Sequence, residues 1–189
     1  MGANSKKIKK LKRKLKDLRA RLKKTAVAAV SPLAPPSGFP DIPHIDGVRF
    51  AAVEAGVRYS NRTDLTLIEL APGTTVAGVF TQSATRAAPV LDCQDKLGTD
   101  PEGGAAIIVN SGNANAFTGR SGRASVTAIT SAVADTLGVP ENRVYSASTG
   151  VIGEPLPHDR ITRKIGELTE NLSASAITDA ARAIMTTDT

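Results

Sequence analysis

The alternation of apolar and polar positions predicts strands in the first half of the folded region. Residues 48–57 have strand character, and residues 65–70 alternate more regularly between polar and apolar side chains. A continuous apolar run at 105–109 is typical of a strand buried on both faces. After a turn at 71–73, residues 76–81 are predicted to be a further strand that forms a hairpin with 65–70.

Apolar residues at helical spacing predict three helices further along the chain. The first covers 124–137 and is ended by Gly138. The second begins after Pro157, and the third runs from about 176 to 185 with Ser175 as its N-cap. The apolar positions expected to be buried are Val126, Ile129, Val133 and Leu137 in the first helix and Ile161, Ile165, Leu168 and Leu172 in the second.

Strands followed by helices predict an α/β fold of the layered α+β kind, with mixed sheets and helices packed on them. The 189 residues suggest one domain of ordinary size with a short extension. Hydrophobic residues make up 41% of the chain but aromatic residues only 3%, so the core must be built from Ala, Val, Ile and Leu. No apolar run approaches the length of a membrane span.

Residues 5–24 form a separate element in which apolar side chains recur three and four positions apart among Lys and Arg. This pattern predicts a basic amphipathic helix with a narrow apolar seam. Such a helix can pair as a coiled coil, lie on an anionic membrane, bind RNA, or remain a solvated and partly disordered extension. Like charges beside the seam oppose self-pairing, so among the functional alternatives an anionic partner is favoured. The apolar positions are Ile8, Leu11, Leu15, Leu18 and Leu22.

The positive net charge of the chain comes from this element alone. Residues 1–24 hold nine Lys and three Arg against one Asp, whereas the rest of the chain holds 12 basic and 17 acidic residues. The folded region is therefore mildly acidic and has no general basic face for nucleic acid. We accordingly predict three segments: a basic helical tail at 1–30, a Pro-rich linker at 31–43 and a folded domain at 44–189.

Targeting, redox and metal-binding signals are weak. The apolar stretch 26–30 is too short for the core of a signal peptide, and the Lys-rich tail is a poor mitochondrial presequence, so we expect a cytoplasmic protein. A single cysteine, Cys93, fits a reducing compartment, and its acidic neighbours Asp92 and Asp95 are expected to raise the pKa of the thiol. No His, Cys and acid cluster has the spacing of a zinc site.

The segment 144–153 carries the clearest candidate chemistry. Its first residues, V-Y-S, predict a strand, and Ser148, Thr149 and Gly150 predict a turn behind that strand. Such a turn can aim a backbone N–H and a hydroxyl at one point, and these are the two donors that the oxyanion of an acyl transfer requires. The alternative is a plain turn of small polar residues.

A second polar segment, N-S-G-N-A-N-A at 110–116, follows the buried strand. Asparagine tolerates left-handed backbone and forms local hydrogen bonds, which favours an elaborate turn. The functional alternative is an amide-rich loop that lines a polar pocket.

Three segments occur in a fixed order: N-S-G-N-A-N-A at 110–116, S-T-G-V-I-G at 148–153 and I-M-T-T-D-T at 184–189. Residues 50–57 and 78–90 fit the same pattern. The combination resembles the α-chain of the bifunctional ornithine acetyltransferase (glutamate N-acetyltransferase) family of arginine biosynthesis. The resemblance covers about residues 40–189 and excludes the basic tail.

This resemblance implies an autoprocessed enzyme with an α/β two-layer fold and two intertwined chains. A precursor cuts itself before a threonine, which becomes the first residue of the β-chain and the nucleophile. The acetyl group passes from N2-acetylornithine to this threonine and then to glutamate, which gives ornithine and N-acetylglutamate. The implied partner is the β-chain, in a heterotetramer of two α-chains and two β-chains. No cofactor is implied, although some members also accept acetyl-CoA as the acetyl donor.

The family's site residues can be carried onto matching positions. Thr149 and Gly150 match the oxyanion-hole pair, and Thr187, with Thr186 beside it, matches a threonine that contacts ornithine. Residues 110–115 are assigned to loop architecture rather than to catalysis. The nucleophile is expected beyond Thr189, so we expect a fragment that does not transfer acetyl groups by itself.

Two other functions compete with this one. The first is a non-catalytic interaction protein whose basic helix binds RNA or an anionic surface. The second is a related N-terminal-nucleophile hydrolase, such as an aminopeptidase, which the combination of S-T-G-V-I-G with M-T-T-D-T disfavours.

Overall fold

The computed structural model describes residues 11–12, 14–16, 42–98 and 102–186. The chain divides into one unit made up of the first 38 residues and Thr189, and a second unit, Phe39–Asp188. In the first unit the described residues are helical, and the side chains of Leu11 and Leu15 are 61% and 52% exposed. The rest of the predicted basic helix, and all of the predicted linker except residues 42 and 43, lie outside the described residues.

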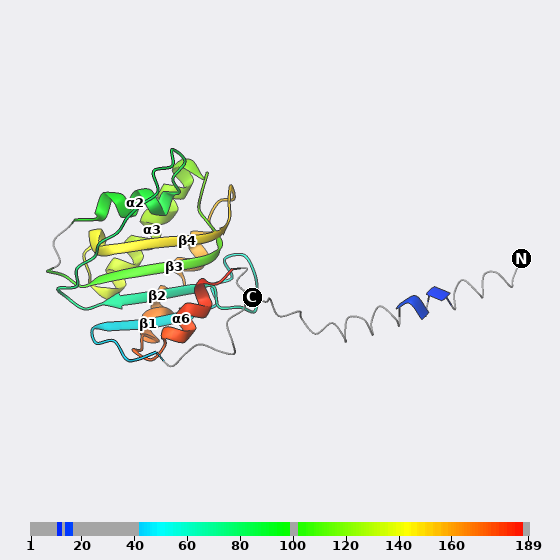
Figure 1. Cartoon of the computed structure of the whole chain (residues 1–189), viewed down its shortest axis with the longest axis horizontal. Coiled ribbons are helices and arrows are strands. Elements are labelled where there is room, and N and C mark those ends of the chain that lie inside the picture. Colours follow the sequence, from blue (N-terminus) through cyan, green and yellow to red (C-terminus); the bar gives the residue numbers. More distant parts are fainter. Residues whose placement is uncertain (1–10, 13, 17–41, 99–101, 187–189) are drawn as a thin grey trace, which may run out of the picture. The chain divides into compact units, whose positions relative to one another are not determined.

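A four-stranded sheet with the order β1-β2-β3-β4 forms the frame of the second unit (Figure 1). Strand β2 pairs antiparallel with both β1 and β3, whereas β3 and β4 pair in parallel. Together with the helices on its faces, this mixed sheet confirms the predicted α/β layered class. The strands are β1 (Val48–Val53), β2 (Leu65–Leu70), β3 (Ala105–Asn113) and β4 (Val144–Val151).

The strand predicted at 76–81 is absent, because both edges of β2 are already occupied. Leu67 pairs with Ala51 of β1 on one side and with Ile108 of β3 on the other. Residues 74–83 have no regular structure, and Val79 in the middle is 99% exposed. The apolar residues of this segment therefore have the composition of a strand, but β2 offers no free edge with which they could pair.

Within the described residues of this unit, five α-helices and one 3-10 turn pack around the sheet. The helix predicted at 124–137 is confirmed as part of α3, which begins five residues earlier, and Gly138 ends it in the left-handed region with φ 68°. The helices of this unit are α2 (Ala88–Lys96), α3 (Gly119–Leu137), α4 (His158–Thr162), α5 (Ile165–Glu170) and α6 (Ile177–Ile184), with the 3-10 turn η1 at Glu141–Arg143.

Two of the helix predictions need correction. The helix expected after Pro157 is divided into α4 and α5; three of its predicted apolar positions are buried, but Leu172 lies beyond α5 and is only partly buried. The N-cap of α6 is Ala176 rather than Ser175. The Ser175 hydroxyl instead lies 2.9 Å from that of Ser173, and no side chain caps α6.

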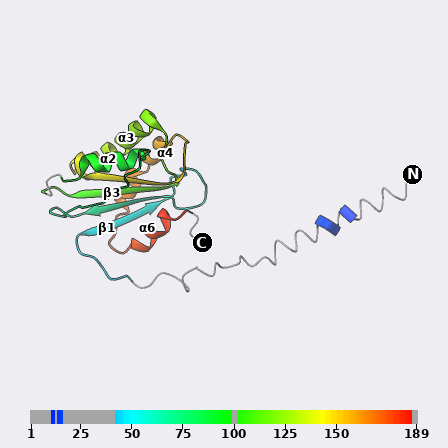
Figure 2. The same ribbon diagram turned by 45° about the horizontal axis from the view of Figure 1, so that its top comes forward.

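Helices cover both faces of the sheet. Figure 2 shows α3 and α4 on one face and α6 on the opposite face. The main core lies between the sheet and the helices α3, α4 and α5, and it is built from aliphatic side chains as the composition predicted. Its most deeply buried members, all 0% exposed, are Leu65, Leu67, Ala106, Val133, Val144 and Leu168.

Helix α2, which the sequence pattern did not predict, lies along the outer edge of β4. Lys96 Nζ donates to Val144 O at 3.1 Å, and Cys93 Sγ donates to Ser146 O at 3.3 Å. These donors satisfy edge carbonyls that would otherwise be open to another strand. Burial is the main cause that raises the pKa of the Cys93 thiol, and the charge of Asp92 adds to it, so the predicted acidic neighbours are the lesser cause.

Two classes of feature are absent from the part of the chain that the structure describes. None of its helices is long and apolar enough to cross a membrane. No group of three His, Cys, Asp or Glu side chains there could hold a metal ion. His158 instead faces Ser125, with Nδ1 3.0 Å from the hydroxyl.

The loop between β1 and β2 is folded around the carboxylate of Asp64, which is 2% exposed. This carboxylate accepts backbone N–H bonds from Ala55 at 2.7 Å, Gly56 at 3.3 Å and Val57 at 2.6 Å. The Asp64 backbone carbonyl also accepts the N–H of Ser111 in β3 at 2.9 Å. One residue therefore fixes this loop against the end of the sheet.

We predict that Asp64→Ala lowers the free energy of unfolding by about 2–4 kcal/mol, because buried N–H groups lose their acceptor. Urea unfolding measures the loss. The control is Asp46→Ala, whose side chain is fully exposed and whose removal should change stability by less than about 0.5 kcal/mol. Equal stability of the two variants would contradict the role given to Asp64.

Candidate active site

The carboxyl ends of β3 and β4 bring the two polar segments together. Their parallel register places Ser111 opposite Thr149 and Gly112 opposite Gly150. The turn predicted at 148–150 is therefore wrong, because β4 continues through these residues to Val151. Small residues are present here because two strands come close together, and the chain does not reverse direction.

Gly150 and Gly112 touch backbone to backbone. Gly150 has φ 135°, and a Cβ atom there would lie 2.3 Å from Gly112 C and 2.6 Å from Asn113 N. Gly112 has φ 101°, and a Cβ atom there would lie 3.0 Å from Arg58 Cβ. Both positions favour glycine through their positive φ, and at Gly150 the backbone of β3 also leaves no space for a side chain.

The backbone of β4 indicates where the Gly150 N–H points. The carbonyls of Val144 and Ser146 face α2, away from β3, whereas Val151 O accepts the N–H of Ala114 on the β3 side at 2.9 Å. Consecutive residues of a strand direct their backbone groups to alternate sides. The N–H of Gly150 therefore points to the outer edge of the sheet, where this residue is exposed.

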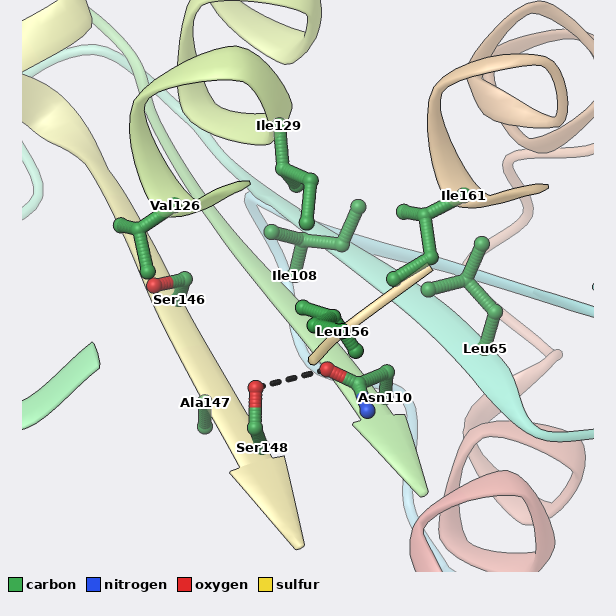
Figure 3. A pocket seen from close by; sticks show the side chains of 10 residues that line it. All are labelled: Leu65, Ile108, Asn110, Val126, Ile129, Ser146, Ala147, Ser148, Leu156 and Ile161. Atoms are coloured by element: carbon green, nitrogen blue, oxygen red, sulfur yellow. Dashed lines mark hydrogen bonds between the residues drawn. The ribbon is translucent and has the colours of Figure 1, made fainter. Parts of the chain in front are cut away.

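Side chains also alternate, so Ser148 and Thr149 lie on opposite faces of the sheet. Ser148 Oγ donates to Asn110 Oδ1 at 2.7 Å on the face covered by α3 (Figure 3). Thr149 is half-buried beside Ser111 on the other face. Among the described residues, no neighbour forms a hydrogen bond with the Thr149 hydroxyl. The hydroxyl of Thr149 and the N–H of Gly150 are thus two donors on consecutive residues.

The cavity beside Ser148, on the face covered by α3, is too small for a substrate. Its cavity has a volume of about 10 Å³ and is lined by Asn110, Ser146 and Ser148 together with aliphatic side chains of the core (Figure 3). A space of this size holds at most one water molecule. An acyl substrate therefore cannot reach Thr149 and Gly150 through this cavity.

Two buried asparagines hold the segment after Ser148 in place. Asn110 Nδ2 donates to Asn113 O at 2.9 Å, so both polar atoms of the Asn110 amide are used. Asn113 Nδ2 donates to Glu154 O at 3.1 Å and to Pro155 O at 3.3 Å. The residues on both sides of Thr149 and Gly150 are in this way attached to the end of β3.

The asparagine segment differs in part from the predicted turn. Residues 110–113 belong to β3, and only the residues after them form the loop. Asn115 adopts the left-handed backbone expected of asparagine, with φ 46°, and its Nδ2 donates to Gly122 O at 3.0 Å. Its Oδ1 accepts the Thr118 hydroxyl at 2.8 Å, which joins this loop to the start of α3.

The carboxyl end of α6 lies at the same end of the sheet as the ends of β3 and β4 (Figures 1 and 2). The Arg62 guanidinium donates to Met185 O and fixes this end of the helix to the loop between β1 and β2. Thr186 is half-buried, whereas Thr187 lies outside the described residues. The structure thus brings Thr186 and the pair Thr149–Gly150 to one end of the sheet.

A hollow of about 450 Å³ lies beside Asn113 and contains two arginines. Arg58 forms an ion pair with Glu154 and also donates a hydrogen bond to it. This hydrogen bond is the main cause that raises the pKa of the Arg58 guanidinium. Arg160 Nη1 donates to Gly56 O at 2.6 Å. Both cations are therefore engaged in holding the loops that surround the site.

One residue of the site, Ser111, was not predicted from the sequence. Ser111 is 1% exposed, lies opposite Thr149, and its hydroxyl has no hydrogen-bond partner among the described residues. Its place in the N-S-G segment was visible, but only the pairing of β3 with β4 identifies its neighbour.

Residues 49–189 match the ArgJ family. The chain belongs to the ArgJ family. It is 63% identical over 163 residues to the arginine biosynthesis bifunctional protein ArgJ of Ruegeria pomeroyi, a match that covers 86% of this chain and 40% of that protein. The corresponding protein of Bradyrhizobium diazoefficiens is 49% identical, with 86% of this chain and 38% of that protein covered. The predicted family resemblance is thus confirmed, and the chain spans about 40% of the length of these relatives.

Solved structures agree with this assignment. An ornithine acetyltransferase from Mycobacterium tuberculosis, crystallised with ornithine, is 38% identical with a TM-score of 0.70, and the match covers 76% of this chain and 77% of that one. The ArgJ protein of Bacillus halodurans is 36% identical with a TM-score of 0.67, covering 76% of this chain and 74% of that one. The fold described above is therefore that of an ArgJ-family chain.

We predict that Gly150→Ala lowers the free energy of unfolding by at least about 3 kcal/mol, since strain at positive φ adds to overlap with the backbone of β3. Gly153→Ala is the matched control, because it has φ 83° but no atom within 4 Å of the new Cβ. It should cost only about 1–2 kcal/mol. Chemical unfolding of both variants measures the difference, and equal losses would show that the two strands are not in close contact.

Proposed function

We propose that this chain is the α-part of an acyltransferase that moves an acetyl group from N2-acetylornithine to glutamate in arginine biosynthesis. The observation that carries the proposal is the pair of neighbouring donors, Thr149 Oγ1–H and Gly150 N–H, at the open end of β4. The names of the relatives, and the ornithine bound to the Mycobacterium tuberculosis enzyme, support the substrate class.

The two donors stabilise negative charge on the reacting carbonyl oxygen. A threonine outside these 189 residues, at the start of the β-chain, attacks the acetyl carbonyl of N2-acetylornithine, and its own α-amine takes the hydroxyl proton. The carbonyl oxygen becomes negative and accepts hydrogen bonds from Thr149 and Gly150. Collapse of this intermediate breaks the C–N bond, releases ornithine with the proton on its amine, and leaves an acetyl-threonine ester.

The second half of the reaction uses the same donors. The neutral amine of glutamate attacks the ester carbonyl, and the oxygen again becomes negative beside Thr149 and Gly150. Collapse breaks the C–O bond, so that the threonine hydroxyl is restored and N-acetylglutamate leaves. Because the donors are fixed by the strand before substrate arrives, they need no rearrangement as charge develops.

Thr187, with Thr186 beside it, is proposed to bind the ornithine part of the substrate. What supports this role is that α6 ends at the same end of the sheet as Thr149.

The partner is the β-chain, in a heterotetramer of two α-chains and two β-chains. No cofactor is required, acetyl-CoA is an alternative acetyl donor, and the cytoplasm is the expected location.

A chimera tests the donor pair. This chain is joined to the part of the Ruegeria pomeroyi relative that it does not span, and ornithine release from N2-acetylornithine is measured. Thr149→Ala should lower kcat by about 100- to 1,000-fold, the usual cost of removing one oxyanion donor. The control is Thr136→Ala, because Thr136 is an exposed threonine of α3 whose hydroxyl bonds only Ala132 O. Full activity of Thr149→Ala, or ornithine release by the isolated chain, would contradict the proposal.

A second function is favoured by the charge of the tail. Residues 1–24 carry twelve basic residues and one acidic residue, and Leu11 and Leu15 in the described part are exposed. We propose that this element binds RNA or an anionic surface. Sedimentation with anionic vesicles and RNA mobility shifts should lose their signal when residues 1–30 are deleted, whereas acetyl transfer by the chimera should not change. Unchanged binding after the deletion would exclude the tail as the binding element.

A further inference from the structure

The Ser111 hydroxyl is a buried donor without an acceptor. Ser111 is 1% exposed, and its Oγ makes no hydrogen bond within the described residues, although the Ser111 backbone N–H is held by Asp64 O at 2.9 Å. Nearly all buried polar side chains in proteins have a partner, and an unpaired one reduces stability. Because this unpaired hydroxyl does not stabilise the fold, its presence calls for a role in function.

Thr149 is the nearest polar side chain that the strand pairing offers to Ser111. The two residues face each other across β3 and β4, on the same face of the sheet. Neighbouring strands lie about 4.8 Å apart, a gap that rotation of the two hydroxyl-bearing side chains about χ1 can close. Neither hydroxyl is committed elsewhere among the described residues, so no hydrogen bond opposes either rotation.

The two backbones cannot separate or slide when these hydroxyls rotate. Gly112 and Gly150 are in direct contact immediately after them. On the opposite face, the bond from Ser148 Oγ to Asn110 Oδ1 holds β4 in register at 2.7 Å. The relative position of Ser111 and Thr149 is thus fixed by their neighbours, and only their side-chain rotors remain adjustable.

We propose that Ser111 is a positioning residue for acetyl transfer: its O–H donates to Thr149 Oγ1, and this directs the Thr149 proton to the oxyanion. The inference rests on the proposed function, since it assigns a task to the oxyanion donor Thr149. A hydroxyl that accepts one hydrogen bond has only part of its rotation left for donating another. A chain of two hydroxyls also polarises each donor toward the negative charge.

This arrangement affects the transition state more than the bound substrate. Negative charge on the acetyl oxygen is small in the substrate and large in the tetrahedral intermediate. The Ser111–Thr149 hydrogen bond therefore stabilises the transition state more than the bound substrate. It should raise kcat without changing KM.

The test uses the same chimera and two serines that are alike in burial. Ser111→Ala should lower kcat about 5- to 10-fold at unchanged KM. Ser146→Ala is the matched control, because its hydroxyl is likewise buried and unpartnered but lies on the α3 side of β4 (Figure 3). The control should keep full kcat. Neither substitution should lower the Tm of the isolated chain by more than about 2 °C, since neither removes a hydrogen bond of the resting structure.

A double substitution shows whether Ser111 acts through Thr149. In a Thr149→Val background, Ser111→Ala should produce no further loss of kcat. An additive loss would overturn the inference, as would full activity of Ser111→Ala or a Tm decrease that accounts for the loss. If Thr149→Ala abolishes transfer while Ser111→Ala does not, the proposed function stands and this role fails. If the unsubstituted chimera folds but transfers no acetyl group, both the proposed function and the role of Ser111 are wrong.

Discussion

The contact between Gly112 and Gly150 determines how the end of the sheet is built. With no side chain at Gly150, β4 approaches β3 until backbone meets backbone at Gly112. This brings Ser111 opposite Thr149 and leaves Gly150 at the exposed edge, with its N–H directed away from β3. The donors assigned to catalysis exist as neighbours only because this contact fixes both their backbone direction and their separation.

Buried polar groups around this contact make the arrangement rigid. Asn110 and Asn113 hold the chain before and after the donors, and Asp64 holds both the β1–β2 loop and the N–H of Ser111. Each of these groups would destabilise the fold if it lost its partners, so they favour a single geometry. Rigid support of this kind is what an oxyanion site requires, because its donors must be in place before charge develops.

The sequence pattern predicted those elements whose signal is local. The alternation at 65–70 gave the bounds of β2, and Gly138 gave the end of α3. Features that depend on tertiary partners could not be predicted from the sequence pattern. Residues 76–81 have strand-like composition but find no free edge, and residues 148–150 have turn-like composition but pair with β3. Helix α2 was missed because its role is to cover the edge of β4, which is a property of the assembled sheet. The Ser111–Thr149 juxtaposition likewise depends on register. The proposed function came from the family resemblance, because the local pattern alone did not indicate it.

The direction of the Gly150 N–H is the most direct test of this account, and NMR can measure it in the isolated chain. Scalar couplings across hydrogen bonds, recorded together with amide hydrogen exchange, report which β4 amides bond to β3. We predict a coupling from the Thr149 amide to a β3 carbonyl. For the Gly150 amide we predict fast exchange and no coupling to β3. A protected Gly150 amide coupled to a β3 carbonyl would contradict it, because that donor would already be engaged by the sheet.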